Sequence, residues 1–198
     1  MAERERLREV LAESEHLGFL GPGEAFAGFD HAAGFAAALR AAGTVLDLGS
    51  GGGLPGLLLA VLRPELSVTL LDASVTRTDF LRRAVGRLEL GARVRVVTGR
   101  AELVVRTPGW RGALDAVVSR SFGPPPVTAE CAAGFLRVGG QLLVSEPPDA
   151  PTDRWPPDGV AVLGLVRDAL DAPGLASFTA VTSCPDRFPR RSLRPPLW

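Results

Sequence analysis

The chain has 198 residues, of which 46% are hydrophobic and 22% are charged, the proportions of an ordinary globular protein. Its 22 acidic and 22 basic residues give a net charge of zero, which excludes a global electrostatic attraction to nucleic acid. The apolar runs are too short to span a bilayer, and no apolar segment of a signal peptide follows the charged N-terminus. Cys131 and Cys184 lack metal-ligand spacing, so we expect reduced thiols in a cytoplasmic protein without a metal.

The charge is unevenly distributed along the chain. Residues 1–30 carry a net charge of −4, and residues 182–198 carry +3. Such a basic tail is typical of a phosphate contact, although a solvated terminus is the simpler alternative. All basic residues are arginine, since the chain contains no lysine, so arginine enrichment by itself does not indicate RNA binding.

The apolar periodicity predicts an alternation of strands and helices after two N-terminal helices. We expect helices at 3–17 and 30–42, the second capped by Asp30, with a loop from Gly18 to Gly28 between them. Further helices are predicted at 55–63, 75–89 and 126–136, with a short turn at 101–105. Strands are predicted at 44–48, 67–72, 93–98, 114–118, 140–145, 160–166 and 176–183. The alternation predicts an α/β fold with a mostly parallel sheet, whose ligands lie at the carboxyl ends of the strands.

A glycine-rich turn follows the first of these strands. The sequence Asp47-Leu-Gly49-Ser-Gly51-Gly-Gly53-Leu-Pro55 reads as a strand end, a tight turn and the start of a helix. Glycine brings bare backbone and a positive helix end against a ligand. A turn without a ligand is the alternative, but ordering so many glycines is costly in conformational entropy.

An acid at the end of the second strand completes this pattern. Asp72 comes 19 residues after Gly53, where a carboxylate can accept hydrogen bonds from both ribose hydroxyls of an adenosine. A dinucleotide fingerprint requires a third glycine at position 54, which is Leu54 here. Asp47, two residues before the turn, favours a cationic ligand over a pyrophosphate. The residues therefore favour S-adenosyl-L-methionine, with a dinucleotide as the alternative.

Several local strings together resemble the RsmG (GidB) family, bacterial methyltransferases of guanine N7 in 16S ribosomal RNA. The strings are Val45 to Ala60, Val68 to Asp72, Arg77 with Phe80-Leu-Arg82, Gly99-Arg-Ala-Glu102, Val117-Val-Ser-Arg120, Gly139 to Leu143 and Phe188-Pro-Arg-Arg191. They cover roughly residues 40–145 and the tail. The resemblance implies a class I S-adenosylmethionine-dependent methyltransferase (Rossmann-like) fold: a mostly parallel seven-stranded sheet with a reversed last strand and helices on both faces.

By matching positions, the resemblance also implies a set of site residues. The cofactor residues would be Gly49, Leu54, Ala101, Glu102 and Arg120, joined by Gly51 and Asp72 from the argument above. Arg77 and Arg190 are candidate substrate contacts, with a solvated side chain as the alternative for each. We expect His16 and His31 to be structural, and we identify no catalytic base. Methylation of guanine N7 requires none, because N7 has a free lone pair.

The chain departs from the family pattern at several places. Leu20-Gly-Pro-Gly-Glu24 stands where the family has an Asn-Leu-Thr segment, and Asp30 replaces the arginine of an Arg-His pair. Val75-Thr76-Arg77 stands where the family has Gly-Lys-Arg, and Glu146-Pro147 stands where it has Lys-Gly. Three functions remain open from the residues: a ribosomal RNA methyltransferase, a methyltransferase of a small molecule or protein, and a non-catalytic cofactor-binding module. We expect one domain over residues 1–198, with a helical extension (1–42), a cofactor-binding core (43–146) and C-terminal strands with a basic tail (147–198). We expect a monomer that binds ribosomal RNA or the 30S subunit and no membrane.

Overall fold

The computed structural model describes residues 2–40, 43–147, 149–151, 153–170 and 172–198. Seven strands form one sheet: β1 (Thr44–Leu48), β2 (Ser67–Asp72), β3 (Val94–Thr98), β4 (Leu114–Ser119), β5 (Leu136–Ser145), β6 (Leu165–Arg167) and β7 (Leu175–Ala180). The helices are α1 (Ala2–His16), α2 (Glu24–Ala38), α3 (Gly56–Leu62), α4 (Val75–Arg87), α5 (Ala101–Val104), α6 (Pro125–Ala133) and α7 (Pro157–Ala161). No helix among the described residues is long and apolar enough to cross a membrane.

The strand order is β3-β2-β1-β4-β5-β7-β6. β1 to β5 are parallel, while β7 runs antiparallel to both β5 and β6. The predicted mostly parallel sheet with a reversed last strand is therefore confirmed. The chain order reverses beside β1, so the loops after β1, β2 and β4 meet at one edge of the sheet, where such folds bind ligands.

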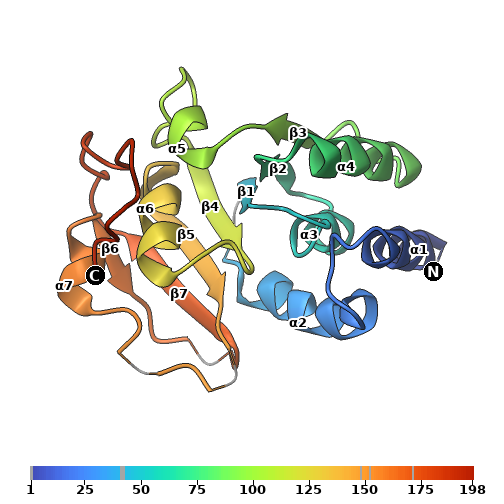
Figure 1. Cartoon of the computed structure of the whole chain (residues 1–198), viewed down its shortest axis with the longest axis horizontal. Coiled ribbons are helices and arrows are strands. Elements are labelled where there is room, and N and C mark those ends of the chain that lie inside the picture. Colours follow the sequence, from blue (N-terminus) through green and yellow to red (C-terminus); the bar gives the residue numbers. More distant parts are fainter. Residues whose placement is uncertain (1, 41–42, 148, 152, 171) are drawn as a thin grey trace.

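Helices cover both faces of the sheet and bury a separate apolar cluster on each (Figure 1). One cluster joins α1 to α4, and the other joins α5 to α7 and the C-terminal tail. The strand residues alternate between them: Val45 faces the first cluster and Leu46 the second. Both faces are apolar because side chains of a parallel sheet alternate and helices cover each side.

The second helix differs from its prediction. α2 begins at Glu24 rather than at residue 30, so the predicted loop up to Gly28 and the predicted cap at Asp30 are wrong. The cause lies in the preceding helix, where the Glu15 carboxylate accepts hydrogen bonds from the backbone N–H groups of Gly23 (2.8 Å) and Ala25 (2.9 Å). These bonds satisfy N–H groups at the start of α2 and lower the pKa of Glu15.

The C-terminal third is also more helical than predicted. Residues 157–161, expected at the boundary of a strand, form α7, which has prolines at its first positions. Of the predicted 160–166 strand only Leu165 and Val166 lie in a strand, β6, which ends at Arg167 and follows a turn at Gly164 with φ +80°. The other strand predictions match to within a few residues, except that β5 begins at Leu136. Positions 41–42 of the predicted second helix lie outside the described residues.

Candidate cofactor and acceptor site

The glycine turn after β1 has the left-handed backbone that its sequence indicates. Gly49, Gly51 and Gly53 have φ values of +73°, +50° and +104°. The N–H groups of the turn are used within the protein: those of Gly49 and Ser50 donate to the Leu71 carbonyl, at 2.9 and 3.0 Å. These hydrogen bonds hold the turn against the end of β2 and leave few of its backbone N–H groups free to bind a phosphate.

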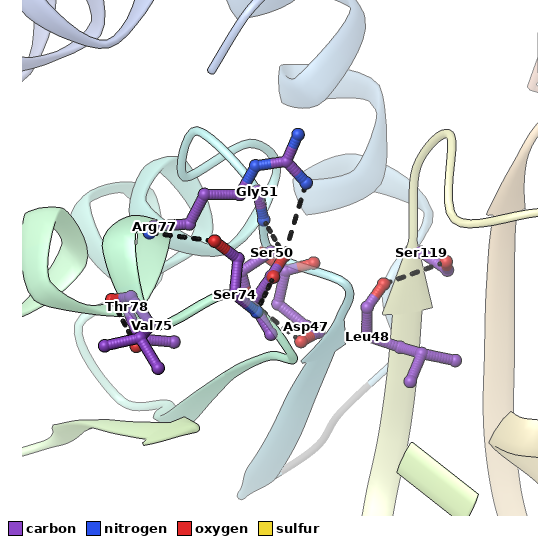
Figure 2. Close-up of polar contacts among 10 residues, drawn as sticks. Asp47, Leu48, Ser50, Gly51, Ser74, Val75, Arg77, Thr78 and Ser119 are labelled. Atoms are coloured by element: carbon purple, nitrogen blue, oxygen red, sulfur yellow. Dashed lines mark hydrogen bonds and ion pairs between the residues drawn. The ribbon is translucent and has the colours of Figure 1, made fainter. Parts of the chain in front are cut away.

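Asp72 connects the glycine turn to the start of α4. Its Oδ2 accepts from the Gly51 N–H at 2.9 Å, and its Oδ1 accepts from the Ser74 N–H at 2.8 Å. Figure 2 shows Gly51 on the glycine turn and Ser74 at the start of α4, with Arg77 on the first turn of that helix. A carboxylate has about four lone-pair positions, so two remain for a ligand.

One cavity of about 330 Å³ opens beside Asp72, and we call it the Asp72 cavity. Its lining includes five of the predicted site residues, namely Gly49, Asp72, Arg77, Ala101 and Glu102. Glu102 is almost fully buried and accepts from Arg100 Nε at 2.6 Å. Leu193, from the C-terminal tail, also lines this cavity. The sequence did not predict this contribution from the tail.

A neighbouring cavity of about 330 Å³, the Gly51 cavity, lies along the glycine turn. Gly49, Gly51, Leu54, Arg77 and Arg120 all contribute to its lining. Arg77 and Gly49 line both cavities, so the structure brings all the predicted cofactor residues to one continuous region of the sheet edge.

A third cavity of about 370 Å³, the Glu146 cavity, lies beyond the ends of β4 and β5. Phe122 borders both it and the Asp72 cavity. The Phe122 ring lies against the turn, because a Cβ added at Gly49 would come within 2.5 Å of its Cδ2 atom. Phe122 thus stands at the border between the Asp72 cavity and the Glu146 cavity.

Arg120 borders both the Gly51 cavity and the Glu146 cavity. It forms an ion pair with Glu24 of α2, and burial lowers the pKa of the guanidinium. Gly28 makes this approach possible, since a Cβ there would come within 2.7 Å of Arg120 Nη1 and 2.9 Å of Leu54 Cδ1. Sequence reasoning missed Glu24, whose role depends on the position of α2.

Asp47 lies beneath the turn and contributes to none of these three cavities. Its side chain is fully buried, and Oδ2 accepts from the Gly56 N–H at 3.0 Å. Its Oδ1 has no hydrogen-bond partner among the described residues. Burial raises the pKa of Asp47 to about 7, and the nearby Asp72 carboxylate adds to the shift. In this structure Asp47 therefore supports the turn from below.

This raised pKa predicts a pH-dependent stability. Asp47 stays protonated in the folded protein up to a pH near 7, whereas the unfolded chain loses that proton near its ordinary pKa of 3.8. Its contribution to stability is therefore fully present below that ordinary value and is lost as the pH rises through 7. Between pH 5 and 7, we expect the wild type to lose about 2 kcal/mol of unfolding free energy relative to Asp47→Asn. Urea unfolding of both proteins across pH 5 to 8 checks this, and parallel profiles would contradict it.

The left-handed backbone of the turn predicts a large effect of replacing Gly51. Gly51→Val should abolish binding of S-adenosylhomocysteine, because a β-branched residue is strongly disfavoured at a φ of +50°. The matched control is Gly86→Val, on an exposed part of α4 where an added Cβ meets no atom within 4 Å. Calorimetry should show that Gly86→Val binds S-adenosylhomocysteine with the affinity of the wild type. If folded Gly51→Val also binds it normally, the glycine turn is not part of the cofactor site.

The remaining candidates lie elsewhere. Arg190 lines none of the three cavities, and its guanidinium donates from Nε and Nη2 to the buried Glu130 carboxylate, at 2.9 and 2.8 Å. His16 is exposed on α1, while His31 lines the Glu146 cavity and packs edge-on against Phe35. The guanidinium of Arg190 therefore already has a structural partner, which makes it a poor candidate for a substrate contact.

Comparison with known proteins gives consistent matches. The family model GidB, described as rRNA small subunit methyltransferase G, matches residues 30–146. Proteins named ribosomal RNA small subunit methyltransferase G are similar to this chain: one from Rubrobacter xylanophilus is 47% identical over 53% of this chain and 40% of its own length. Another, from Deinococcus deserti, is 36% identical over 74% of this chain and 64% of its own length. The chain spans about half the length of the relatives it matches.

Solved methyltransferases share the fold at low sequence identity. A putative O-methyltransferase from Klebsiella pneumoniae has a TM-score of 0.61 at 18% identity, covering 88% of this chain and 89% of the other. Geranyl diphosphate C-methyltransferase from Streptomyces coelicolor, solved with S-adenosyl-L-homocysteine, has a TM-score of 0.60 at 16% identity, covering 77% and 80%. The fold is that of the class I methyltransferases. Because the family model matches more than half of the residues, the chain belongs to the GidB family, rRNA small subunit methyltransferase G.

Proposed function

We propose that this protein is an S-adenosylmethionine-dependent methyltransferase that modifies guanine N7 in 16S ribosomal RNA. The observation that carries the proposal is the convergence of Gly49, Asp72, Ala101 and Glu102 on one cavity at the carboxyl edge of a methyltransferase sheet. Family membership and the names of the relatives support methylation of small-subunit ribosomal RNA.

The residues of the Asp72 cavity fit the proposed cofactor. The remaining lone pairs of the Asp72 carboxylate can accept from ribose hydroxyls, and the apolar wall from Ala101 and Val127 suits a base. Three amides of the turn, those of Gly49, Ser50 and Gly51, are already bonded to Leu71 and Asp72 and are not free for a pyrophosphate. This favours a cofactor without phosphate, and S-adenosylmethionine supplies a methyl group on a sulfonium when bound.

The protein's own contribution to the reaction is positioning. Guanine N7 needs no deprotonation, so the site must align N7 with the methyl group and exclude water. Phe122 and Arg120 lie at the borders between the cavities, where they can restrict the path between the two reactants. This chemistry requires no general base from the chain.

The RNA contact is proposed to be local, because the net charge of the chain is zero. Arg191 and Arg194 are exposed and flank Leu193, which lines the Asp72 cavity, so the basic tail reaches the rim of the site. Arg77 is exposed on the same rim. We propose that these arginines contact RNA phosphates, in a cytoplasmic, monomeric protein. The division into an extension (1–42), a cofactor-binding core (43–146) and a C-terminal part (147–198) of one domain belongs to this proposal.

The test is methyl transfer from labelled S-adenosylmethionine to 30S subunits, naked 16S ribosomal RNA and a metabolite extract. We expect label in 16S RNA, mapped to N7 of a guanine. Label only in the metabolite extract would replace the RNA proposal with a small-molecule reaction. Cofactor binding without any transfer would indicate a non-catalytic binding module.

The tail arginines give a separate prediction about RNA affinity. The double variant Arg191→Ala/Arg194→Ala should reduce the slope of log affinity against log salt by about 0.7–0.9 for each phosphate that is no longer neutralised. Its affinity for S-adenosylhomocysteine should stay unchanged, because neither arginine lines the cofactor cavities. A salt series of binding to 30S subunits measures the slope, and an unchanged slope would exclude a role for these arginines in binding phosphate.

A further inference from the structure

The Glu146 cavity has a carboxylate at its wall whose function the cofactor site does not explain. Glu146 directly follows β5, and its backbone N–H donates to the Gly174 carbonyl at 2.7 Å. Its side chain is only 10% exposed and lines the cavity that Phe122 also borders. Burying a carboxylate is costly unless hydrogen-bond donors compensate for the lost water. The groups that contact the Glu146 carboxylate therefore show how much of its hydrogen-bonding capacity remains for a ligand.

One oxygen of Glu146 is held by a rigid donor. The indole Nε1–H of Trp155 donates to Glu146 Oε1 at 3.0 Å. Trp155 is almost fully buried, with its ring 4.7 Å from that of Phe178 and 6.4 Å from that of Trp198, centre to centre. Because these rings restrain the indole, the carboxylate is positioned before any ligand arrives.

The second oxygen retains hydrogen-bonding capacity. Arg154 Nη1 lies 3.7 Å from Glu146 Oε2, which is close enough for attraction but too far for a hydrogen bond. Arg154 lines the same cavity and offsets the negative charge. The other carboxylate of the cavity, Glu24, is already paired with Arg120. Glu146 is thus the acidic group of this cavity best placed to accept donors from a ligand.

We propose that Glu146 recognises the acceptor base by accepting hydrogen bonds from the N1–H and the 2-amino group of guanine. This inference rests on the proposed function and adds the residue that selects the base. The donors N1–H and N2–H lie on the six-membered ring, across the base from N7. A guanine whose N7 faces Phe122 and the cofactor region therefore directs these donors away from Phe122, into the cavity that Glu146 also lines.

The donor pattern distinguishes guanine from adenine. Adenine also has N7, but its N1 is an acceptor, which would repel a carboxylate oxygen. Inosine keeps N7, O6 and N1–H and lacks only the 2-amino group. Comparing guanosine with inosine therefore isolates the hydrogen bond from the 2-amino group to the Glu146 carboxylate. A hydrogen bond to a charged acceptor changes affinity by about tenfold or more.

The experiment measures nucleotide binding to the protein saturated with S-adenosylhomocysteine, which blocks the adenosine region. Guanosine, inosine and adenosine 5′-monophosphates are titrated separately, and the indole N–H resonance of Trp155 serves as the local probe. The wild type should bind the guanosine nucleotide about tenfold more tightly than the inosine nucleotide, and should prefer it to the adenosine nucleotide by more than that. Glu146→Gln should reduce that preference to less than about threefold, because its amide offers one acceptor oxygen in place of two. The matched control is Asp153→Asn, an exposed acid outside the cavity lining, which should keep the wild-type preference.

The outcomes separate this inference from the proposed function. Equal affinity of the wild type for guanosine and inosine nucleotides overturns the inference, as does a preference that Glu146→Gln retains. Failure of the guanosine nucleotide to shift the Trp155 resonance at millimolar concentration also overturns it. Methyl transfer from labelled S-adenosylmethionine to 30S subunits is measured separately, on the same purified proteins without S-adenosylhomocysteine. If the wild type transfers no methyl group to 30S subunits, the proposed function is wrong, even if Glu146 discriminates between the nucleotides.

Discussion

Replacing Arg190 by alanine should lower the free energy of unfolding by about 3 kcal/mol, the largest stability effect we expect. The Arg190 backbone N–H donates to Glu130 Oε1 at 2.6 Å, and its guanidinium binds both carboxylate oxygens. Glu130 is fully buried on α6, and its hydrogen bonds raise the pKa of Arg190. Removing the guanidinium leaves a buried carboxylate without its main partner. Urea unfolding at neutral pH measures the effect.

Arg191→Ala is the matched control for this prediction. Arg191 is the next residue, is exposed, and forms no ion pair among the described residues. Its replacement should change the unfolding free energy by less than about 0.5 kcal/mol. Equal stability of the two variants would show that the Arg190–Glu130 ion pair does not hold the tail against α6.

Replacing Asp72 by alanine should weaken binding of S-adenosylhomocysteine by about 1–3 kcal/mol, the range for removing hydrogen bonds to a charged group. The change removes the proposed ribose acceptor and also the partner of the Gly51 and Ser74 N–H groups. Binding should therefore decrease both because the ribose has no acceptor and because the turn is less ordered. Isothermal titration calorimetry on the folded variant measures the change.

The control for Asp72→Ala is Asp79→Ala. Asp79 lies on the exposed side of α4, where it pairs with Arg82 at 2.7 Å and lines neither the Asp72 cavity nor the Gly51 cavity. Its affinity for S-adenosylhomocysteine should equal that of the wild type. Unchanged affinity in folded Asp72→Ala would remove Asp72 from the cofactor site.

Local sequence alone determined the central part of the fold. The bounds of β1 and β2 were predicted to the residue, and the tight turn after β1 was predicted from its glycines. These features depend on neighbouring residues: apolar runs of strand length, a proline at a helix start and glycines that tolerate left-handed backbone. The position of Asp72 at the site follows from the same local pattern, since one helix and one strand separate it from the turn.

Tertiary contacts determined the start of α2 and the position of Arg190, which the local sequence pattern does not specify. The start of α2 depends on Glu15, ten residues before Ala25, and the place of Arg190 depends on Glu130, 60 residues away. Sequence reasoning weighed Arg190 as an RNA contact because a basic tail has the same composition whether it binds phosphate or a buried acid. The partner of a charged side chain is set by the packing of distant elements, and no spacing along the chain encodes it.

The cavities show the same division. The sequence indicated which residues follow β1, β2 and β4, and so which would gather at the carboxyl edge of the sheet. It did not indicate that Leu193 reaches the Asp72 cavity or that Trp155 holds Glu146. Residues at strand ends are placed by the topology of the sheet, which the alternation of strands and helices predicts. Residues in the irregular C-terminal third are placed only by the folding of that segment over the sheet, which their local sequence does not specify.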